Sequence, residues 1–131
     1  MIRKGDNIDT RMLSAIQLAY IGDAVYELLV RTYIITNKEL TINKMHKSVV
    51  NFVKAENQAK YLRKIEDSLH EEEKNIVRRG RNSKSTTPKN TTFMDYKYAT
   101  GLEALIGYLY LKKDKERIFQ LFEMILSTEK E

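Results

Sequence analysis

Apolar residues recur at spacings of three and four along most of the chain, a pattern typical of amphipathic α-helices that bury one face. The stretches between these runs do not alternate apolar and polar residues over a length that would indicate a β-strand, and the chain has no internal repeat. The pattern therefore predicts an all-α protein of five to seven helices. The helices are expected at about residues 10–35, 41–69, 71–79, 94–111 and 115–126.

The first two expected helices have the clearest apolar sides. Thr41 or Asn43 is expected to cap the first turn of the second helix. In the first helix the residues expected to face the core are Leu13, Ile16, Ala19 or Tyr20, Ala24 and Leu28. In the second helix they are Met45, Val49, Phe52, Ala59 and Leu62.

A basic, hydroxyl-rich segment separates the third and fourth expected helices. It contains the only proline, Pro88, so we expect a flexible loop at about residues 80–92. From Lys74 to Asn90 the chain has six Lys or Arg residues and no acidic residue. Such a loop can simply be solvated, but the absence of acid favours contact with nucleic-acid phosphates. The candidate contacts are Arg78, Arg79, Arg81, Lys84 and Lys89.

Composition narrows the class of protein further. The 131 residues suit a single domain over 1–131, and the net charge of +5 is compatible with an anionic partner. The chain has no cysteine, which excludes disulfides and thiolate zinc sites. It has no signal-like N-terminus and no apolar run near the ~20 residues of a membrane span. We therefore expect a cytoplasmic protein with no membrane partner.

Two carboxylates interrupt otherwise apolar helical sequences. Asp23 lies in "AYIGDAVYELL" beside Gly22, and Glu103 lies in "YATGLEALIGYLYL" between Gly101 and Gly107. Glycine weakens a helix but allows two backbones to approach closely, so helices that cross at these glycines would bring the two carboxylates face to face. A hard cation such as Mg²⁺ would relieve their repulsion.

Simpler roles for these acids are also compatible with the pattern. Asp23 could lie on an exposed polar stripe of its helix, or it could bond to a neighbouring Tyr or Arg. Glu27 lies one turn after Asp23, so it could support the same site, although a salt bridge to Arg31 is the simpler interpretation.

The two segments that carry these acids, in this order, resemble the ribonuclease III family. "LAYIGDAVYELLVRTYI" resembles the signature helix of that family, and "TGLEALIGYLYL" resembles its second acidic helix. The Mini-ribonuclease III branch, which lacks a double-stranded-RNA-binding domain, is the most similar branch and shares the "RGRN…PKN" element. The resemblance covers roughly residues 13–126.

The resemblance implies a fold, a reaction and partners. It implies a helical endonuclease domain that works as a homodimer, binds Mg²⁺ and cleaves double-stranded RNA. For the Mini branch the expected substrate is the precursor of 23S ribosomal RNA, and a ribosomal protein stays open as an accessory partner. The family's catalytic and metal-binding acids fall on Asp23 and Glu103. The basic loop would then replace the missing RNA-binding domain.

The chain departs from larger members of the family at the metal site. Those members have further carboxylates where this chain has Ile16, Ala19 and Thr100, so the usual four metal-binding acids are reduced to two. The Mini branch shows the same reduction. We therefore expect activity with one firmly held Mg²⁺, while the number of metal ions stays open.

Two other functions compete with the nuclease, and the dimer contacts stay open. One is a non-catalytic RNA-binding ribosome-assembly factor on a degenerate nuclease fold, which the missing carboxylates favour. The other, a helical protein-interaction module, leaves the acid pair and the basic loop unexplained. Tyr20, Tyr26, Tyr108 and Tyr110 are candidates for either core or dimer packing.

Overall fold

The computed structural model describes residues 9–83, 86–89 and 91–129, and within these ranges all the regular elements are helices, without a strand. The all-α prediction is therefore confirmed. The described α-helices are α1 (Ala15–Asn37), α2 (Ile42–Val53), α3 (Ala55–Ile65), α4 (Glu71–Arg81), α5 (Phe93–Leu111) and α6 (Lys115–Glu129). Two short 3-10 helices, η1 (Thr10–Met12) and η2 (Glu66–Ser68), complete the described elements.

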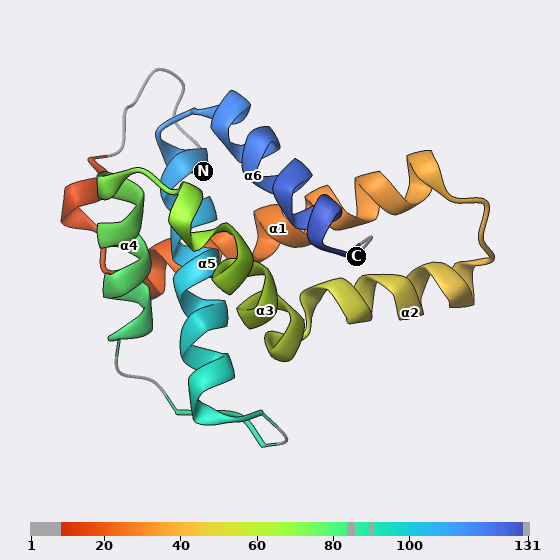
Figure 1. Cartoon of the computed structure of the whole chain (residues 1–131), viewed down its shortest axis with the longest axis horizontal. Helices are drawn as coiled ribbons and strands as arrows, with labels where there is room; N and C mark the ends of the chain where they lie inside the picture. Colours follow the sequence, from red (N-terminus) through yellow and green to blue (C-terminus); the bar gives the residue numbers. More distant parts are fainter. Residues whose placement is uncertain (1–8, 84–85, 90, 130–131) are drawn as a thin grey trace, which may run out of the picture.

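Helix α5 is the centre of the fold. It packs against α1, α3, α4 and α6, and it is buried on almost every side from Ala99 to Leu109. Figure 1 shows α5 running between α4 and α3, while α1 and α2 form a hairpin that extends beyond this body. No helix in the described part of the chain is long and apolar enough to cross a membrane.

Helix α1 starts later than the apolar pattern predicts. Its first helical residue is Ala15, because Ser14 and Gln17 form a capping box that satisfies the first turn. The Ser14 hydroxyl accepts the Gln17 backbone N–H at 3.1 Å, and the Gln17 side chain accepts the Ser14 N–H at 2.9 Å. The expected helix over residues 10–35 is thus a separate 3-10 turn followed by α1.

The single helix expected over residues 41–69 is wrong, because the chain bends at Lys54 between α2 and α3. Thr41 does cap α2, but Lys54 is extended, with φ −65° and ψ 145°. The last carbonyls of α2, which such a break would leave unpaired, are satisfied by side chains. Asn57 donates to Asn51 O at 2.6 Å, Tyr26 to Phe52 O at 3.0 Å and Gln58 to Val53 O at 2.7 Å.

The buried face of α1 also differs from the expectation. Leu18, Tyr26 and Val30 lie in the core, whereas Tyr20 is 83% exposed and Leu28 is 65% exposed. The expected core role of Ile16, Ala24 and Leu28 is therefore wrong, because the face with Gly22 is the one that lies against α5. The tyrosine candidates divide in the same way: Tyr26 and Tyr108 are buried, and Tyr110 is half-exposed like a surface residue.

A buried ion pair links α4 to α6. Arg117 Nε and Nη2 each donate to Glu73 at 2.8 Å, and Glu73 also accepts the backbone N–H of His70 at 2.8 Å. Burial acts to raise the pKa of Glu73, but the bonds from Arg117 and His70 outweigh it and hold that pKa below its usual value. Glu73 thus stays ionised in the folded protein, and its bonds to Arg117 hold the first turn of α4 against α6.

Candidate active site

The crossing of α1 and α5 brings the two carboxylate-bearing segments together. A Cβ atom added at Gly22 would lie 1.7 Å from the backbone oxygen of Glu103, and one added at Gly107 would lie 1.9 Å from the backbone oxygen of Leu18. Both distances are far below van der Waals contact, so only glycine fits at either position. The helices therefore cross at their glycines as the sequence predicts, with Gly107 as the partner of Gly22.

Gly101, the other glycine of α5, belongs to a different crossing. Its face of α5 meets α4, where a Cβ added at Gly80 would lie 2.8 Å from Gly101 Cα. This second crossing is less tight than the first. It holds the arginine-bearing end of α4 against the helix that carries Glu103.

Asp23 and Glu103 are brought into contact across the first crossing. Asp23 is exposed on α1, whereas Glu103 is only partly exposed on α5. Burial, the charge of Asp23 and a hydrogen bond with Asp23 together raise the pKa of Glu103 to about 8. The pair thus has one carboxylate open to solvent and one held in the protein.

Gln58 is the residue at this site that the sequence interpretation missed. Its side chain is only 2% exposed, and its Nε2 donates to Glu103 Oε2 at 3.4 Å as well as to Val53 O. Its Oε1 has no hydrogen-bond partner in the described part of the protein. Gln58 lies one turn before Leu62 on the apolar side of α3, and a glutamine at such a position was the one signal that could have found it.

The donor set suits a hard divalent cation that keeps much of its own water. The described residues include no group of three or more His, Cys, Asp or Glu that could hold a metal, so the candidate site rests on two carboxylates. The orphaned Gln58 oxygen beside them is an acceptor that water carried by such a cation would satisfy. Asp23 and Glu103 therefore fit Mg²⁺.

The neighbouring positions do not add carboxylates to the pair. Glu27 bonds to Arg31 at 2.9 Å, the salt bridge that its spacing suggested. Thr100 is buried and its hydroxyl donates to Tyr96 O at 2.9 Å, and Ala19 is buried as well. These positions thus contribute packing or local hydrogen bonds around the carboxylate pair.

The arginines expected at the start of the loop lie on α4 instead. The helix continues to Arg81, so the loop begins at residue 82 rather than at about 80. Arg78 and Arg79 are exposed on this last turn, and Lys89 is exposed in the loop. Lys84 lies outside the described residues.

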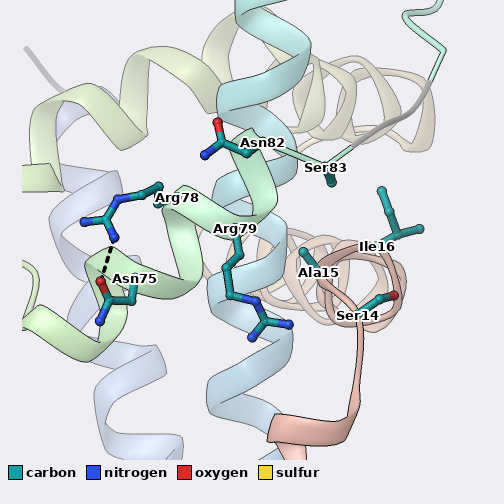
Figure 2. A pocket seen from close by; sticks show the side chains of 8 residues that line it. All are labelled: Ser14, Ala15, Ile16, Asn75, Arg78, Arg79, Asn82 and Ser83. Carbon is teal, nitrogen blue, oxygen red and sulfur yellow. Dashed lines mark hydrogen bonds between the residues drawn. The ribbon is translucent and has the colours of Figure 1, made fainter.

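Arg78 and Arg79 border a hollow between α4 and the start of α1. The hollow has a volume of about 740 Å³, and Figure 2 shows both arginines on its α4 side with Ser14 and Ile16 opposite. Arg79 reaches across to donate to Leu13 O at 2.8 Å, and Arg78 donates to Asn75 at 2.9 Å. The hollow thus has a basic α4 side and a largely apolar α1 side at Ala15 and Ile16.

This hollow and the carboxylate pair lie along one face of α1. Ile16, which lines the hollow, and Asp23 are seven residues apart, which is two helical turns and about 10 Å along the axis. Basic side chains and the acidic pair therefore lie within reach of one extended ligand.

Arg81 has intramolecular partners. Its guanidinium lies 4.6 Å from the ring centre of Tyr98, which Arg63 also approaches at 4.5 Å, and it pairs with Glu66 at 3.5 Å. These contacts tie α4 to η2 and α5. Of the four predicted cations that the structure describes, Arg81 is therefore the one most engaged with the protein itself.

Comparison with known proteins agrees with this site. Residues 16–114 match the model of the Ribonuclease III domain. A Mini-ribonuclease 3 of Thermoanaerobacter sp. (strain X514) is 53% identical over 113 residues, covering 86% of this chain and 80% of the relative. A Mini-ribonuclease 3 of Clostridium tetani is 46% identical over 125 residues, covering 94% of this chain and 83% of the relative.

A solved structure has the same fold. The crystal structure of a protein from Fusobacterium nucleatum superposes with a TM-score of 0.86 at 37% identity, covering 92% of this chain and 99% of that one. The fold and the crossing helices define a ribonuclease of the helical endonuclease class, which acts on RNA. The chain belongs to the ribonuclease III family, in its Mini-ribonuclease III branch. Enzymes of this family in general depend on a divalent metal ion.

Proposed function

We propose that this endoribonuclease cleaves double-stranded RNA with Mg²⁺ held by Asp23 and Glu103. The observation that carries the proposal is the contact of these two carboxylates across the α1–α5 crossing, where only glycine permits the approach. No other group in the described residues offers more potential metal ligands.

The reaction is hydrolysis of a phosphodiester bond. A bound Mg²⁺ supplies neutralising charge at the scissile phosphate and lowers the pKa of water that attacks phosphorus. Asp23 is exposed at the surface, where RNA can approach, and Glu103 accepts a hydrogen bond from the buried amide of Gln58. Two carboxylates thus suffice for one firmly bound cation, and a second ion would need ligands from the RNA.

The basic side of the molecule is proposed to bind the RNA backbone. Arg78 and Arg79 border the hollow whose α1 side, at Ile16, lies about two helical turns from Asp23, and Lys89 adds a further positive charge in the loop. Phosphate contacts of this kind supply most nucleic-acid affinity without reading sequence. Arg81 is assigned a supporting role, since Tyr98 and Glu66 already engage its guanidinium.

A homodimer is proposed because a duplex has two antiparallel strands to cut. The exposed face of α1 carries an apolar stripe beside Asp23, at Ile16, Tyr20, Leu28 and Ile35. A second copy that packs on this stripe around a twofold axis would place two carboxylate pairs on one RNA. The stripe supports a dimer in which the catalytic sites lie near the interface.

The cellular role is proposed from the resemblance to the Mini-ribonuclease III branch. We assign the precursor of 23S ribosomal RNA as the substrate, which places the enzyme in the cytoplasm where that RNA is made. A ribosomal protein bound to the precursor is the accessory partner that would present the duplex. Processing of precursor RNA with and without bound ribosomal proteins tests this part separately.

The main experiment is cleavage of a perfect RNA duplex by the purified protein with Mg²⁺ or with a chelator. We expect both strands to be cut only with Mg²⁺. Asp23→Asn and Glu103→Gln should abolish cleavage and leave RNA binding largely intact, whereas Glu123→Gln, which changes an exposed acid on α6, should cleave normally. Cleavage by Asp23→Asn at the wild-type rate would contradict the assigned metal site.

A further inference from the structure

The buried amide of Gln58 has an unusual set of partners. Its two Nε2 hydrogens are used by Val53 O at 2.7 Å and Glu103 Oε2 at 3.4 Å. Its Oε1 is buried without a partner among the described residues. Buried side-chain oxygens nearly always accept a hydrogen bond, so this one requires a donor that protein side chains here do not provide.

The orientation of the amide follows from these contacts. If nitrogen and oxygen were exchanged, an oxygen would face the carbonyl of Val53 at 2.7 Å, which is repulsive, so Nε2 belongs where it is. Oε1 shares its carbon atom with Nε2, so bond lengths alone keep it within about 6 Å of the Glu103 carboxylate. A single water with hydrogen bonds of ~2.8 Å on each side spans most of that distance.

We propose that Gln58 is a positioning residue of the metal site, which orients Glu103 through Nε2 and accepts a hydrogen bond at Oε1 from water carried by the bound cation. The inference rests on the proposed metal role of Asp23 and Glu103. It also explains why α2 and α3 bend at Lys54: the bend places Gln58 between the end of α2 and the carboxylate. The site is then completed by an uncharged residue on a third helix.

The test measures metal binding without RNA, using the full chain and Mn²⁺, whose free form is visible by electron paramagnetic resonance. Gln58→Leu removes both amide functions and should weaken Mn²⁺ binding about tenfold, as is typical of residues that support metal ligands. Gln58→Glu keeps an acceptor oxygen at the Oε1 position and should bind Mn²⁺ more tightly than Gln58→Leu, although its second oxygen faces Val53 O and should lower thermal stability. In cleavage assays, raising Mg²⁺ should restore the kcat of Gln58→Leu, with the KM for RNA unchanged.

Controls separate this role from a structural one. Gln58→Leu and Gln58→Glu both lose the N–H donor to Val53 O. If Gln58 only stabilises the α2–α3 junction, the two variants should therefore lose Mn²⁺ affinity and thermal stability to the same extent. That result, or unchanged Mn²⁺ affinity in Gln58→Leu, would overturn the inference. Gln120→Leu, the same change on exposed α6, should bind Mn²⁺ as wild type does.

Asp23→Asn distinguishes failure of this inference from failure of the proposed function. If Asp23→Asn loses Mn²⁺ and Gln58→Leu retains it fully, the carboxylate pair stands and only the role of Gln58 is overturned. If Asp23→Asn binds Mn²⁺ as wild type does, the metal site lies elsewhere, and both proposals fall together.

Discussion

Gly22→Ala tests the close approach of α1 and α5 most directly. The added Cβ would lie 1.7 Å from the Glu103 backbone oxygen, and real Cβ contacts are essentially never shorter than 3.0 Å, so the helices must separate by about 1.3 Å. Because the obstacle is backbone, no side-chain rotation can relieve it. Overpacking of a well-packed core costs roughly 1–3 kcal/mol, and a clash with backbone belongs at the upper end. Alanine's better helix propensity returns ~1 kcal/mol.

The net expectation is a loss of roughly 2 kcal/mol, which for a domain of this size lowers Tm by about 8 °C. The same displacement moves Glu103 relative to Asp23, and a shift of ~1 Å at reacting groups can cost about 100-fold in rate. Thermal unfolding followed by circular dichroism measures the first effect, and duplex cleavage well below Tm measures the second.

Gly80→Ala is the matched control, because it makes the same change at the other helix crossing of α5. There the nearest atom, the backbone Cα of Gly101, is 2.8 Å away, so α4 and α5 must separate by only a few tenths of an ångström, and Tm and cleavage should fall much less than in Gly22→Ala. If Gly22→Ala melts and cleaves like Gly80→Ala, then α1 and α5 do not pack as closely as described, and the carboxylate pair loses its structural support.

Three further changes probe the RNA surface, the dimer and the α4–α6 ion pair. Arg78→Ala combined with Arg79→Ala should weaken RNA binding and reduce the slope of log affinity against log salt by about 0.7–0.9 for each phosphate that the variant no longer neutralises. Leu28→Lys should convert the dimer into a folded monomer, as measured by light scattering, because it places a charge in the apolar stripe. Glu73→Gln should cost roughly 3 kcal/mol at pH 7, measured by urea unfolding, because it leaves the charge of Arg117 buried and unpaired. The fold lowers the pKa of Glu73 from its ordinary 4.5, so the ionised carboxylate stabilises the protein above pH 4.5. This stabilisation is lost as pH falls through the pKa of Glu73 in the folded state. Wild type should therefore lose stability in acid for this reason, and Glu73→Gln should not.

The first two of these changes have a control of the same chemical kind. Lys115→Ala removes an exposed charge at the start of α6 and should leave the salt slope unchanged. If the double arginine variant also has the wild-type slope, then Arg78 and Arg79 do not contact RNA phosphates. Phe119→Lys places a charge on the exposed side of α6 and should leave the dimer intact; a dimer that survives Leu28→Lys would move the interface elsewhere. A parallel pH dependence in Glu73→Gln and wild type would show that other carboxylates govern acid unfolding.

Local patterns in the sequence determined some of the elements of this fold. Three- and four-residue spacing predicted the helices over 94–111 and 115–126 to within a few residues, because these runs are long and lack internal breaks. Glycines inside apolar helices likewise predicted the α1–α5 crossing, since close backbone approach is the main reason to accept their cost. The pairing of Asp23 with Glu103 followed from the same logic, and the contact is present.

The tertiary structure decided what depends on partners distant in sequence. Nothing near Lys54 indicates a break, because the carbonyls freed there are satisfied by Tyr26 from α1 and by Asn57 and Gln58 from α3. The buried side of α1 was set by the α5 crossing, so periodicity alone placed Leu28 on the wrong face. The sequence places Gln58 on the apolar side of α3, but only the folded structure shows that its amide lies against Glu103. Helical periodicity is a local property, whereas burial and hydrogen-bond satisfaction are properties of the assembled helices.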